Sequence, residues 1–297
     1  MSIRGRRFRD AFSGFSMNLS LLFVHFLALA VGAGLFLKSW PLLAHTPIGT
    51  LLFSSAWHPL RGDFGFYPFI IGTLLVTALA MSVSIPVCLL SAVYLSEYAN
   101  RRLRESARLA VDILAGIPSV IYGLCGALVI VPIVQDLGQA MGVQTTGYSL
   151  LAGGIVLAVM VAPFIISLTV EVFRTIPIEA RESALALGST RWEMVRYVLL
   201  RHARKGVMAA IVLGFSRAFG ETMAVLMVVG NVPKVPHSLF DPAYPLPALI
   251  ANNYGEMMSI PLYDSALMLA ALILMLVVAT FSLAAHFTLL RIGRHGI

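Results

Sequence analysis

Long stretches without a charged side chain constrain this sequence more than any other feature. They separate Asp10 from Lys38, Asp63 from Glu97, Asp112 from Asp136, Asp136 from Glu171 and Asp264 from Arg291. Each is longer than the roughly 20 apolar residues that a helix needs to cross a bilayer. Another apolar stretch, residues 206–233, is interrupted only by Arg217 and Glu221. The sequence predicts an all-α polytopic membrane protein with six transmembrane helices, forming a single domain over residues 1–297.

The composition excludes a water-soluble globule. The chain is 59% apolar and 12% charged, with a mean hydropathy of +0.88, whereas about 25% of a typical soluble domain is charged. The two cysteines, Cys88 and Cys125, fall within predicted spans, where cysteine behaves as a small apolar residue. Neither cysteine has other metal-binding side chains at a ligand spacing. We therefore expect neither a metal site nor a disulfide.

The basic residues cluster in the connections on one side of the predicted spans. Most of the 21 Lys and Arg residues fall there: Arg4, Arg6, Arg7, Arg9, Arg101, Arg102, Arg104, Arg108, Arg174, Arg181, Arg191, Arg196, Arg201, Arg204, Lys205, Arg291 and Arg294. The opposite side has only Lys38, Arg61 and Lys234. Because cytoplasmic loops of membrane proteins carry an excess of Lys and Arg, we expect both termini in the cytoplasm. The net charge of +7 then sets orientation and does not indicate nucleic-acid binding.

Helix-breaking residues occur within several of the predicted spans. Pro86 lies in the second span, Gly116 and Pro118 at the start of the third, and Pro163 in the fourth. One interpretation is ordinary, because neighbouring helices satisfy the backbone groups that proline frees in membrane helices. The other is a set of kinked helices around a pathway that changes shape. The breakers alone do not decide between the two.

The two connections on the less basic side differ in composition. Residues 38–67 contain Trp40, Trp57 and Tyr67, which suit the aromatic belt at a membrane interface. Residues 232–261 are rich in proline, which predicts a rigid, turn-rich cap with little regular structure. Either connection is suited to receive an external partner.

Residues 175–204 carry start and stop signals for two short helices separated by a sharp turn. Pro177 suits the beginning of the first helix, with acidic residues in its first turns, and Gly188 ends it. Thr190 and Glu193 then form a capping-box pattern that opens the second helix. Met194, Val195, Val198 and Leu199 fall on one face of this second helix, and the opposite face is basic. Such a helix can lie on a lipid surface or dock into another protein.

These residues resemble the coupling loop of bacterial ABC-importer permeases. The resemblance rests on the triplet Glu182-Ser183-Ala184, on Gly188 and on Leu199-Leu200, with Ser183 in place of the usual alanine and Arg201 in place of the usual proline. In that family the loop inserts into a groove of a cytoplasmic ATPase subunit. The resemblance therefore implies that residues 175–204 form a cytoplasmic coupling loop. The implied contact residues are Glu179, Glu182, Ala184, Gly188, Arg191 and Trp192.

The segment from Gly214 to Val225, followed by Gly230-Asn231, strongly resembles the permeases of phosphate importers. Its Met-Ala-Val continuation at residues 223–225 is more similar to the PstC-type subunit than to the PstA-type subunit. Shorter similar pieces are residues 57–59, 64–65, 68–73, 117–123 and 238–242. The resemblance implies a type I ABC-importer permease fold in the bacterial plasma (inner) membrane. It also implies three kinds of partner: a second, PstA-type permease, two PstB-type cytoplasmic ATPases and an external PstS-type phosphate-binding protein.

Arg217 and Glu221 are charges at membrane depth, where an isolated arginine costs about 2.5–3.5 kcal/mol on insertion scales. Because they are four residues apart, they fall on one face of a helix and can pair within it. One interpretation is a self-neutralising structural pair. The other is a fixed positive charge for a passing anion, because a guanidinium binds oxyanions through two parallel hydrogen bonds. The resemblance implies the second role, with Arg217, Glu221 and Thr222 in the translocation pathway.

Two other classes of protein compete with this interpretation. A membrane-embedded enzyme needs catalytic groups, but the sequence has no His-Glu-x-x-His motif and no Gly-x-Ser-x-Gly motif. It also has no Gly-Lys dipeptide and hence no Walker A loop, so we expect no cofactor on this chain and place ATP and Mg²⁺ on partner subunits. A secondary anion carrier would need buried carboxylates and inverted repeats, and only Glu221 lies deep in a span. The cargo alternatives within the ABC family are molybdate and sulfate.

Overall fold

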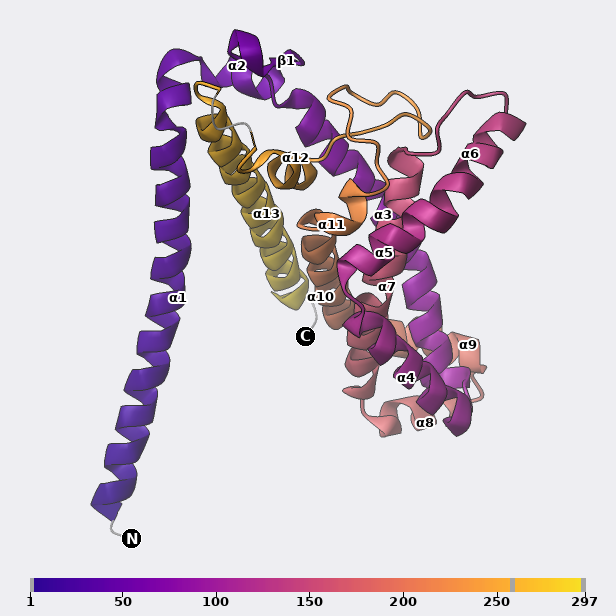
Figure 1. Cartoon of the computed structure of the whole chain (residues 1–297). Coiled ribbons are helices and arrows are strands. Elements are labelled where there is room, and N and C mark those ends of the chain that lie inside the picture. Colours follow the sequence, from indigo (N-terminus) through magenta and orange to yellow (C-terminus); the bar gives the residue numbers. More distant parts are fainter. Residues whose placement is uncertain (1–2, 257–259, 295–297) are drawn as a thin grey trace.

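The computed structural model describes residues 3–256 and 260–294 of the 297-residue chain. Most described residues are helical, and the two described strands, β1 (Trp57–His58) and β2 (Asp63–Phe64), form an antiparallel hairpin. The chain passes back and forth between two ends of the molecule (Figure 1). We call the end that carries α2 and the hairpin the α2 end, and the end that carries α8 and α9 the α8 end.

The helices follow one another in a simple order. The first half of the chain contains α1 (Ile3–His45), α2 (Ile48–Phe53), the 3-10 turn η1 (Pro59–Arg61), α3 (Tyr67–Val93), the π-helical turn η2 (Tyr94–Tyr98), α4 (Arg101–Gly116), α5 (Ser119–Cys125), the π-helical turn η3 (Gly126–Ile130) and α6 (Val131–Ala140). The second half contains α7 (Leu150–Arg174), α8 (Ile178–Ala186), α9 (Arg191–Glu193), the π-helical turn η4 (Met194–Leu199), α10 (Leu200–Phe219), α11 (Met223–Leu226), α12 (Leu246–Asn253) and α13 (Tyr263–Arg294).

Five described helical segments are long and apolar enough to cross a membrane. They are Phe12–His45, Tyr67–Tyr98, Ser119–Ala140, Leu150–Arg174 and Tyr263–Leu283. The sixth predicted span differs from the expectation, because α10 starts in the basic loop and ends at Phe219, with the short helix α11 beyond a break. Five of the six predicted spans are therefore present as long apolar helices, whereas residues 206–233 do not form one continuous apolar helix.

Helix α1 lies apart from the central bundle and packs along α13 (Figure 1). Its large apolar side chains are exposed, among them Phe12, Phe15, Phe23 and Phe26. A helix that is apolar on its open faces is suited to lipid as a solvent. The side chains of the arginines near both termini (residues 4–9, 291 and 294) lie outside the described side chains.

The centre of the molecule is formed by α3, α7 and α10, which pack closely through small residues. A Cβ added at Gly154 of α7 would lie 2.5 Å from Leu79 of α3, and one added at Gly214 of α10 would lie 2.6 Å from Ile165 of α7. The Ser84 hydroxyl of α3 donates a 3.0 Å hydrogen bond to the Ala158 carbonyl of α7. Small residues and polar cross-links of this kind are the usual means by which helices associate in membranes.

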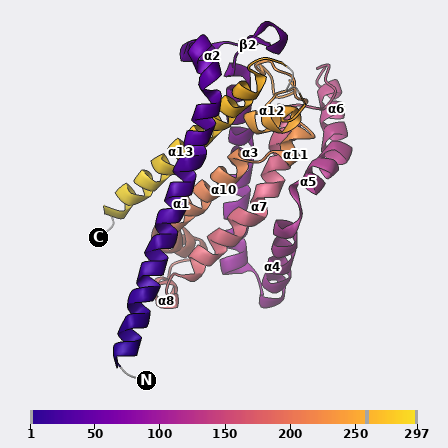
Figure 2. The ribbon, with the colours of Figure 1, turned by 60° about the vertical axis from the view of Figure 1, so that its left-hand side comes forward.

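The helix breakers have two different outcomes. Pro86 and Pro163 lie inside the continuous helices α3 and α7. Gly116 and Pro118 instead flank Ile117, where α4 ends before α5 begins. Figure 2 shows α4 at the α8 end, with α5 and α6 continuing away from it toward the α2 end. Helix α4 is a separate amphipathic helix that was not predicted from the sequence.

The two connections at the α2 end are more structured than the sequence suggested. The proline-rich connection contains the short helix α12, whose Leu246, Ala248 and Leu249 are buried. Trp57 does not face a lipid belt, because its ring packs against Phe69 with 4.8 Å between centroids. Trp57 also contacts Phe64, Phe66 and Tyr263. Trp40 is exposed, as an interfacial residue requires.

Candidate functional site

The break between α10 and α11 positions the three predicted pathway residues. Gly220 caps α10, and the Thr222 hydroxyl donates a 3.3 Å hydrogen bond to the Gly220 carbonyl. Glu221 Oε1 accepts a 3.2 Å hydrogen bond from the Ala224 amide, inside α11. These side-chain bonds satisfy backbone groups that a continuous helix would have paired, so they stabilise the break locally. Arg217 lies in the last turn of α10.

The break overturns the expected pairing of Arg217 with Glu221 within one helix. Ion pairs among the described side chains include Arg101–Glu105, Glu171–Arg174 and Glu97–Arg181, and none of these three joins Arg217 to Glu221. Glu221 lies beyond the helix end, where its carboxylate caps α11 instead. The four-residue spacing predicted a contact that requires an unbroken helix from Arg217 to Glu221. The helix instead ends at Phe219, with Gly220 as its cap, before it reaches Glu221.

Arg217 is exposed and has an aromatic neighbour. Its guanidinium carbon lies 5.4 Å from the centroid of the Phe164 ring of α7, within the range of a cation–π interaction. Its position in the last turn of α10 also suits a cation, because the C-terminal end of a helix carries partial negative charge. The arginine is thus held by a ring and a helix end, and its donors stay available to an oxyanion.

The predicted two-helix loop is present at the α8 end. Helix α8 follows Pro177, Gly188 adopts a left-handed φ of +86°, and Thr190 begins α9. The capping box is complete, because Thr190 Oγ1 accepts a 3.2 Å hydrogen bond from the Glu193 amide and Glu193 Oε2 accepts a 2.8 Å bond from the Thr190 amide. The Thr190 hydroxyl also donates to Glu193 Oε2 at 2.8 Å, and the two bonds that the carboxylate accepts from Thr190 lower the pKa of the Glu193 carboxyl below its usual value.

The implied coupling residues mostly face outward from this loop. Glu179, Glu182, Gly188, Arg191 and Trp192 are exposed. Ala184 is half-buried and packs against the apolar cluster below it. Leu187, next to the turn, is 89% exposed. A protruding apolar tip with charged flanks is suited to a groove of a partner.

The second helix of the loop does not lie on a lipid surface. It continues without a stop from α9 through η4 into α10, so Arg201 in place of a proline marks no helix end. Its apolar face is covered by this chain, since Met194, Val195 and Leu199 are buried with Phe173 and Val93. The apolar face predicted for this helix is therefore present, but it packs against the ends of α3 and α7 and not against a membrane.

Contacts that were not predicted from the sequence fix this loop to the spans. Arg181 of α8 pairs with Glu97 of η2 at 2.9 Å, and it also donates a hydrogen bond to the Phe173 carbonyl of α7. The only sequence signal was that Glu97 is the first charge after the long apolar stretch of the second span. A single sequence does not tell which of many nearby arginines such a carboxylate meets.

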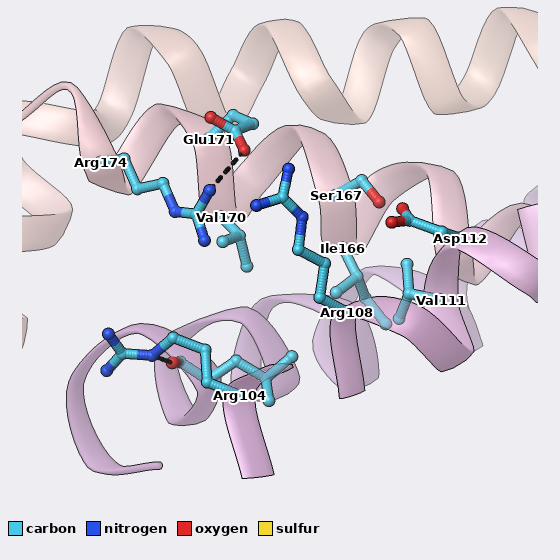
Figure 3. Close-up of a pocket in the computed structure, with 10 residues that line it drawn as sticks. Arg104, Arg108, Val111, Asp112, Ile166, Ser167, Val170, Glu171 and Arg174 are labelled. Carbon is cyan, nitrogen blue, oxygen red and sulfur yellow. Dashed lines mark hydrogen bonds and ion pairs between the residues drawn. The ribbon is translucent and has the colours of Figure 1, made fainter. Parts of the chain in front are cut away.

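A cavity of about 130 Å³ lies beside this region, between α4 and α7. Figure 3 shows Arg108 extending toward α7 between Glu171 and Ser167, while Glu171 holds Arg174 through a 2.8 Å ion pair. Arg104 turns away and donates from Nε to the Leu95 carbonyl at 2.8 Å. The cavity wall thus combines apolar side chains with charges of both signs.

The chain is similar to known transport proteins over most of its length. Residues 84–291 match the family described as binding-protein-dependent transport system inner membrane component. The phosphate transport system permease protein PstC of Xylella fastidiosa (strain Temecula1 / ATCC 700964) is 38% identical over 260 residues, which cover 82% of this chain and 80% of that protein. The PstC protein of Mesorhizobium japonicum is 35% identical over 304 residues, covering 97% and 92%.

Solved structures share the fold at lower identity. A bacterial ABC transporter involved in the import of the acidic polysaccharide alginate matches with a TM-score of 0.64 and 15% identity, over 96% of this chain and 99% of that chain. The MetNI methionine ABC transporter in an inward-facing conformation matches with a TM-score of 0.56 and 22% identity, over 77% and 94%. The chain has the ABC-importer permease fold and is a multi-pass membrane component. By family and sequence identity, it belongs to the binding-protein-dependent transport system inner membrane components, among the phosphate transport system permease proteins PstC.

Proposed function

We propose that this chain is the membrane-spanning permease subunit of an ATP-driven importer that moves inorganic phosphate into the cytoplasm. The observation that carries the proposal is the similarity to PstC permeases over 97% of the chain in one relative. The break at residues 220–222 adds to it, because it leaves an arginine at membrane depth whose donors are not taken by a carboxylate. The spacing of Arg217 and Glu221 in the sequence would not by itself distinguish a cargo-facing arginine from a structural one.

Arg217 is the proposed anion contact of the pathway. A guanidinium offers a planar set of donors that matches the oxygens of phosphate, and it stays charged at every physiological pH. The Phe164 ring lies against the guanidinium of Arg217, 5.4 Å from its central carbon to the ring centroid. Glu221 and Thr222 act indirectly, because their hydrogen bonds hold the break that ends α10 just beyond Arg217. Phosphate can then bind the guanidinium of Arg217 as it passes without displacing a carboxylate.

The loop at the α8 end is the proposed contact with the ATPase. Glu179, Glu182, Ala184, Gly188, Arg191 and Trp192 are its contact residues, and the protruding turn at Leu187 enters the groove of the partner. We assign ATP and Mg²⁺ to two PstB-type ATPase subunits, so this chain is not an enzyme by itself. ATP-driven closure of those subunits then moves the loop and the passes attached to it.

The remaining partners follow from the two ends of the molecule. In the bacterial plasma (inner) membrane the α8 end faces the cytoplasm, together with both termini, because the basic connections gather there. The α2 end faces outward and receives a PstS-type phosphate-binding protein. A second, PstA-type permease completes the pathway, and no nucleic acid is involved. Lipid covers the open faces of α1.

The experiment that tests this function is uptake of labelled phosphate at low external concentration in cells deleted for this gene and complemented with it. Loss of uptake on deletion, competed by unlabelled phosphate but by neither molybdate nor sulfate, supports the phosphate importer. Competition by molybdate or sulfate would instead assign another oxyanion. Uptake that is abolished by collapse of the proton gradient while ATP is maintained would assign a secondary carrier.

A further inference from the structure

One ion pair at the α8 end differs from the others in its burial. The side chains of Arg181 and Glu97 are only 19% and 7% exposed, and their charged atoms lie 2.9 Å apart. The pair Arg101–Glu105 is 91% and 65% exposed, and Arg174–Glu171 is 41% and 59% exposed. Exposed pairs contribute little, whereas removal of one partner of a buried pair leaves an uncompensated charge. Removal of either partner of the Arg181–Glu97 contact should therefore have a larger effect than removal of a partner from the other two pairs.

Arg181 joins three elements that are far apart in the sequence. Its backbone belongs to α8, one Nη donates to Glu97 of η2, and the other Nη donates to the Phe173 carbonyl at the end of α7. Glu97 is fixed in turn, because the Ser96 hydroxyl donates to its Oε1 at 2.7 Å. A single planar guanidinium thus spans the loop and the ends of two central helices.

A second arginine also contacts this end of α3. Arg104 of α4 donates to the carbonyls of Leu95, Ser96 and Ala99 at 2.8, 2.9 and 3.3 Å. These carbonyls lie at the end of a helix, where they have no partner further along the helix. The dashed line at Arg104 in Figure 3 is the bond from its Nε to the Leu95 carbonyl. Segment 94–99 is consequently held by arginines from two different helices, α4 and α8.

We propose that Arg181 is the positioning residue that links α8 mechanically to α3 and α7. Any displacement of α8 pulls Glu97 and the Phe173 carbonyl with it, so that the ends of α3 and α7 move as one unit with the loop. Apolar packing below the loop is non-directional, whereas the forked guanidinium fixes the relative orientation of all three elements. The inference rests on the proposed function, because it takes α8 as the element that the ATPase moves.

The test uses the complete importer, purified and reconstituted in liposomes, with Arg181→Gln, Glu97→Gln and the double variant. We expect each single variant to lower labelled-phosphate uptake per ATP hydrolysed by about fivefold or more, and the double variant to lose no more than either single one, as for partners in one contact. Glu105→Gln is the matched control, because it removes a carboxylate from an exposed pair. Its uptake per ATP should equal that of the wild type.

A second measurement does not depend on phosphate. Binding of a non-hydrolysable ATP analogue should change the amide hydrogen exchange of residues 94–99 in the wild-type importer, and Arg181→Gln should abolish that change while the ATPase still co-purifies. Persistence of the change in Arg181→Gln would overturn the link. Additive losses of uptake per ATP in the double variant would also overturn it. A fall in phosphate uptake that is matched by an equal fall in ATP hydrolysis would overturn it as well. Failure of the proposed function would instead show in the wild type, as liposomes that take up no phosphate.

Discussion

A single glycine sets the shape of the proposed coupling loop. Gly188 has a φ of +86°, in the left-handed region, and a Cβ added there would meet no atom within 4 Å. Glycine is thus needed at this position for its left-handed backbone conformation, and not because a larger side chain would clash. Because Gly188 separates α8 from α9, the direction of the protruding turn depends on this one dihedral angle.

Gly188→Ala should therefore destabilise the loop although it creates no clash. We expect a loss of about 1–2 kcal/mol, the usual cost of a left-handed conformation for a residue with a Cβ, measured by chemical unfolding in detergent. Gly49→Ala is the matched control, because its Cβ also meets nothing and its φ is not positive. An equal effect of the two substitutions would show that the left-handed backbone is not what Gly188 supplies.

The capping box should make the start of α9 sensitive to pH. Hydrogen bonds from Thr190 lower the pKa of Glu193 below its ordinary value of 4.5. A carboxyl with a depressed pKa in the folded state contributes stability above its unfolded pKa, and the contribution is lost as the pH falls through the folded value. Hydrogen-exchange protection of the Thr190 and Glu193 amides should be constant near neutral pH and decline below 4.5. In Glu193→Gln that decline should be absent; its persistence would contradict the role of Glu193.

At the level of residues, the sequence indicated which side chains make contacts, but it did not always indicate which partner each side chain contacts. The capping box was predictable because both partners lie three residues apart within one turn. The pairing of Arg217 with Glu221 was wrong because it assumed an unbroken helix across Gly220. The Arg181–Glu97 pair was not predictable, since the two residues meet only after α3, α7 and α8 have packed.

The contact between α7 and α10 depends on missing side chains. A Cβ at Gly214 would lie 2.6 Å from Ile165 Cγ1, and a Cβ at Gly206 would lie 2.4 Å from Val172 Cγ1. The two glycines thus mark two points at which α10 approaches α7 most closely. Since α10 carries Arg217 at its far end, its distance from α7 also sets where the guanidinium lies relative to Phe164.

Gly214→Ala should separate the two helices slightly and destabilise the protein by about 1–3 kcal/mol, the typical cost of overpacking. The measurement is thermal or chemical unfolding of the purified chain in nanodiscs. Gly14→Ala in α1 is the control, because its Cβ would meet nothing within 4 Å. A Gly214→Ala variant as stable as Gly14→Ala would show that α7 and α10 do not pack as closely as described.

At the level of elements, the long apolar helices were the most predictable part. The spacing of apolar residues within them is not needed for this prediction, because a charge-free run of sufficient length is enough to indicate a transmembrane helix. The sixth pass was harder, since its break arises from local hydrogen bonds at residues 220–224 rather than from proline. Helix α12 was missed because Pro245 and Pro247 suggested a loop, whereas proline is tolerated in the first turn of a helix.

The whole molecule has two ends with different proposed environments. Leu60 at the α2 end and Leu187 at the α8 end are 88% and 89% exposed, which makes them a matched pair. In a background without Cys88 and Cys125, Leu60→Cys should react with a membrane-impermeant maleimide in intact spheroplasts. Leu187→Cys should react only after permeabilisation. The reverse pattern would invert the proposed orientation and place the loop away from any cytoplasmic ATPase.

The central claim is that phosphate passes Arg217 at the break between α10 and α11, and the most direct measurement is labelled-phosphate uptake by cells carrying Arg217→Gln as their only copy. We predict a loss of about tenfold or more, equivalent to the roughly 1.4 kcal/mol that one charge-assisted hydrogen bond can supply, with unchanged chain abundance and ATPase co-purification. Arg101→Gln, in an exposed pair, should transport normally. Normal uptake by Arg217→Gln would contradict the account and leave Arg217 a structural role.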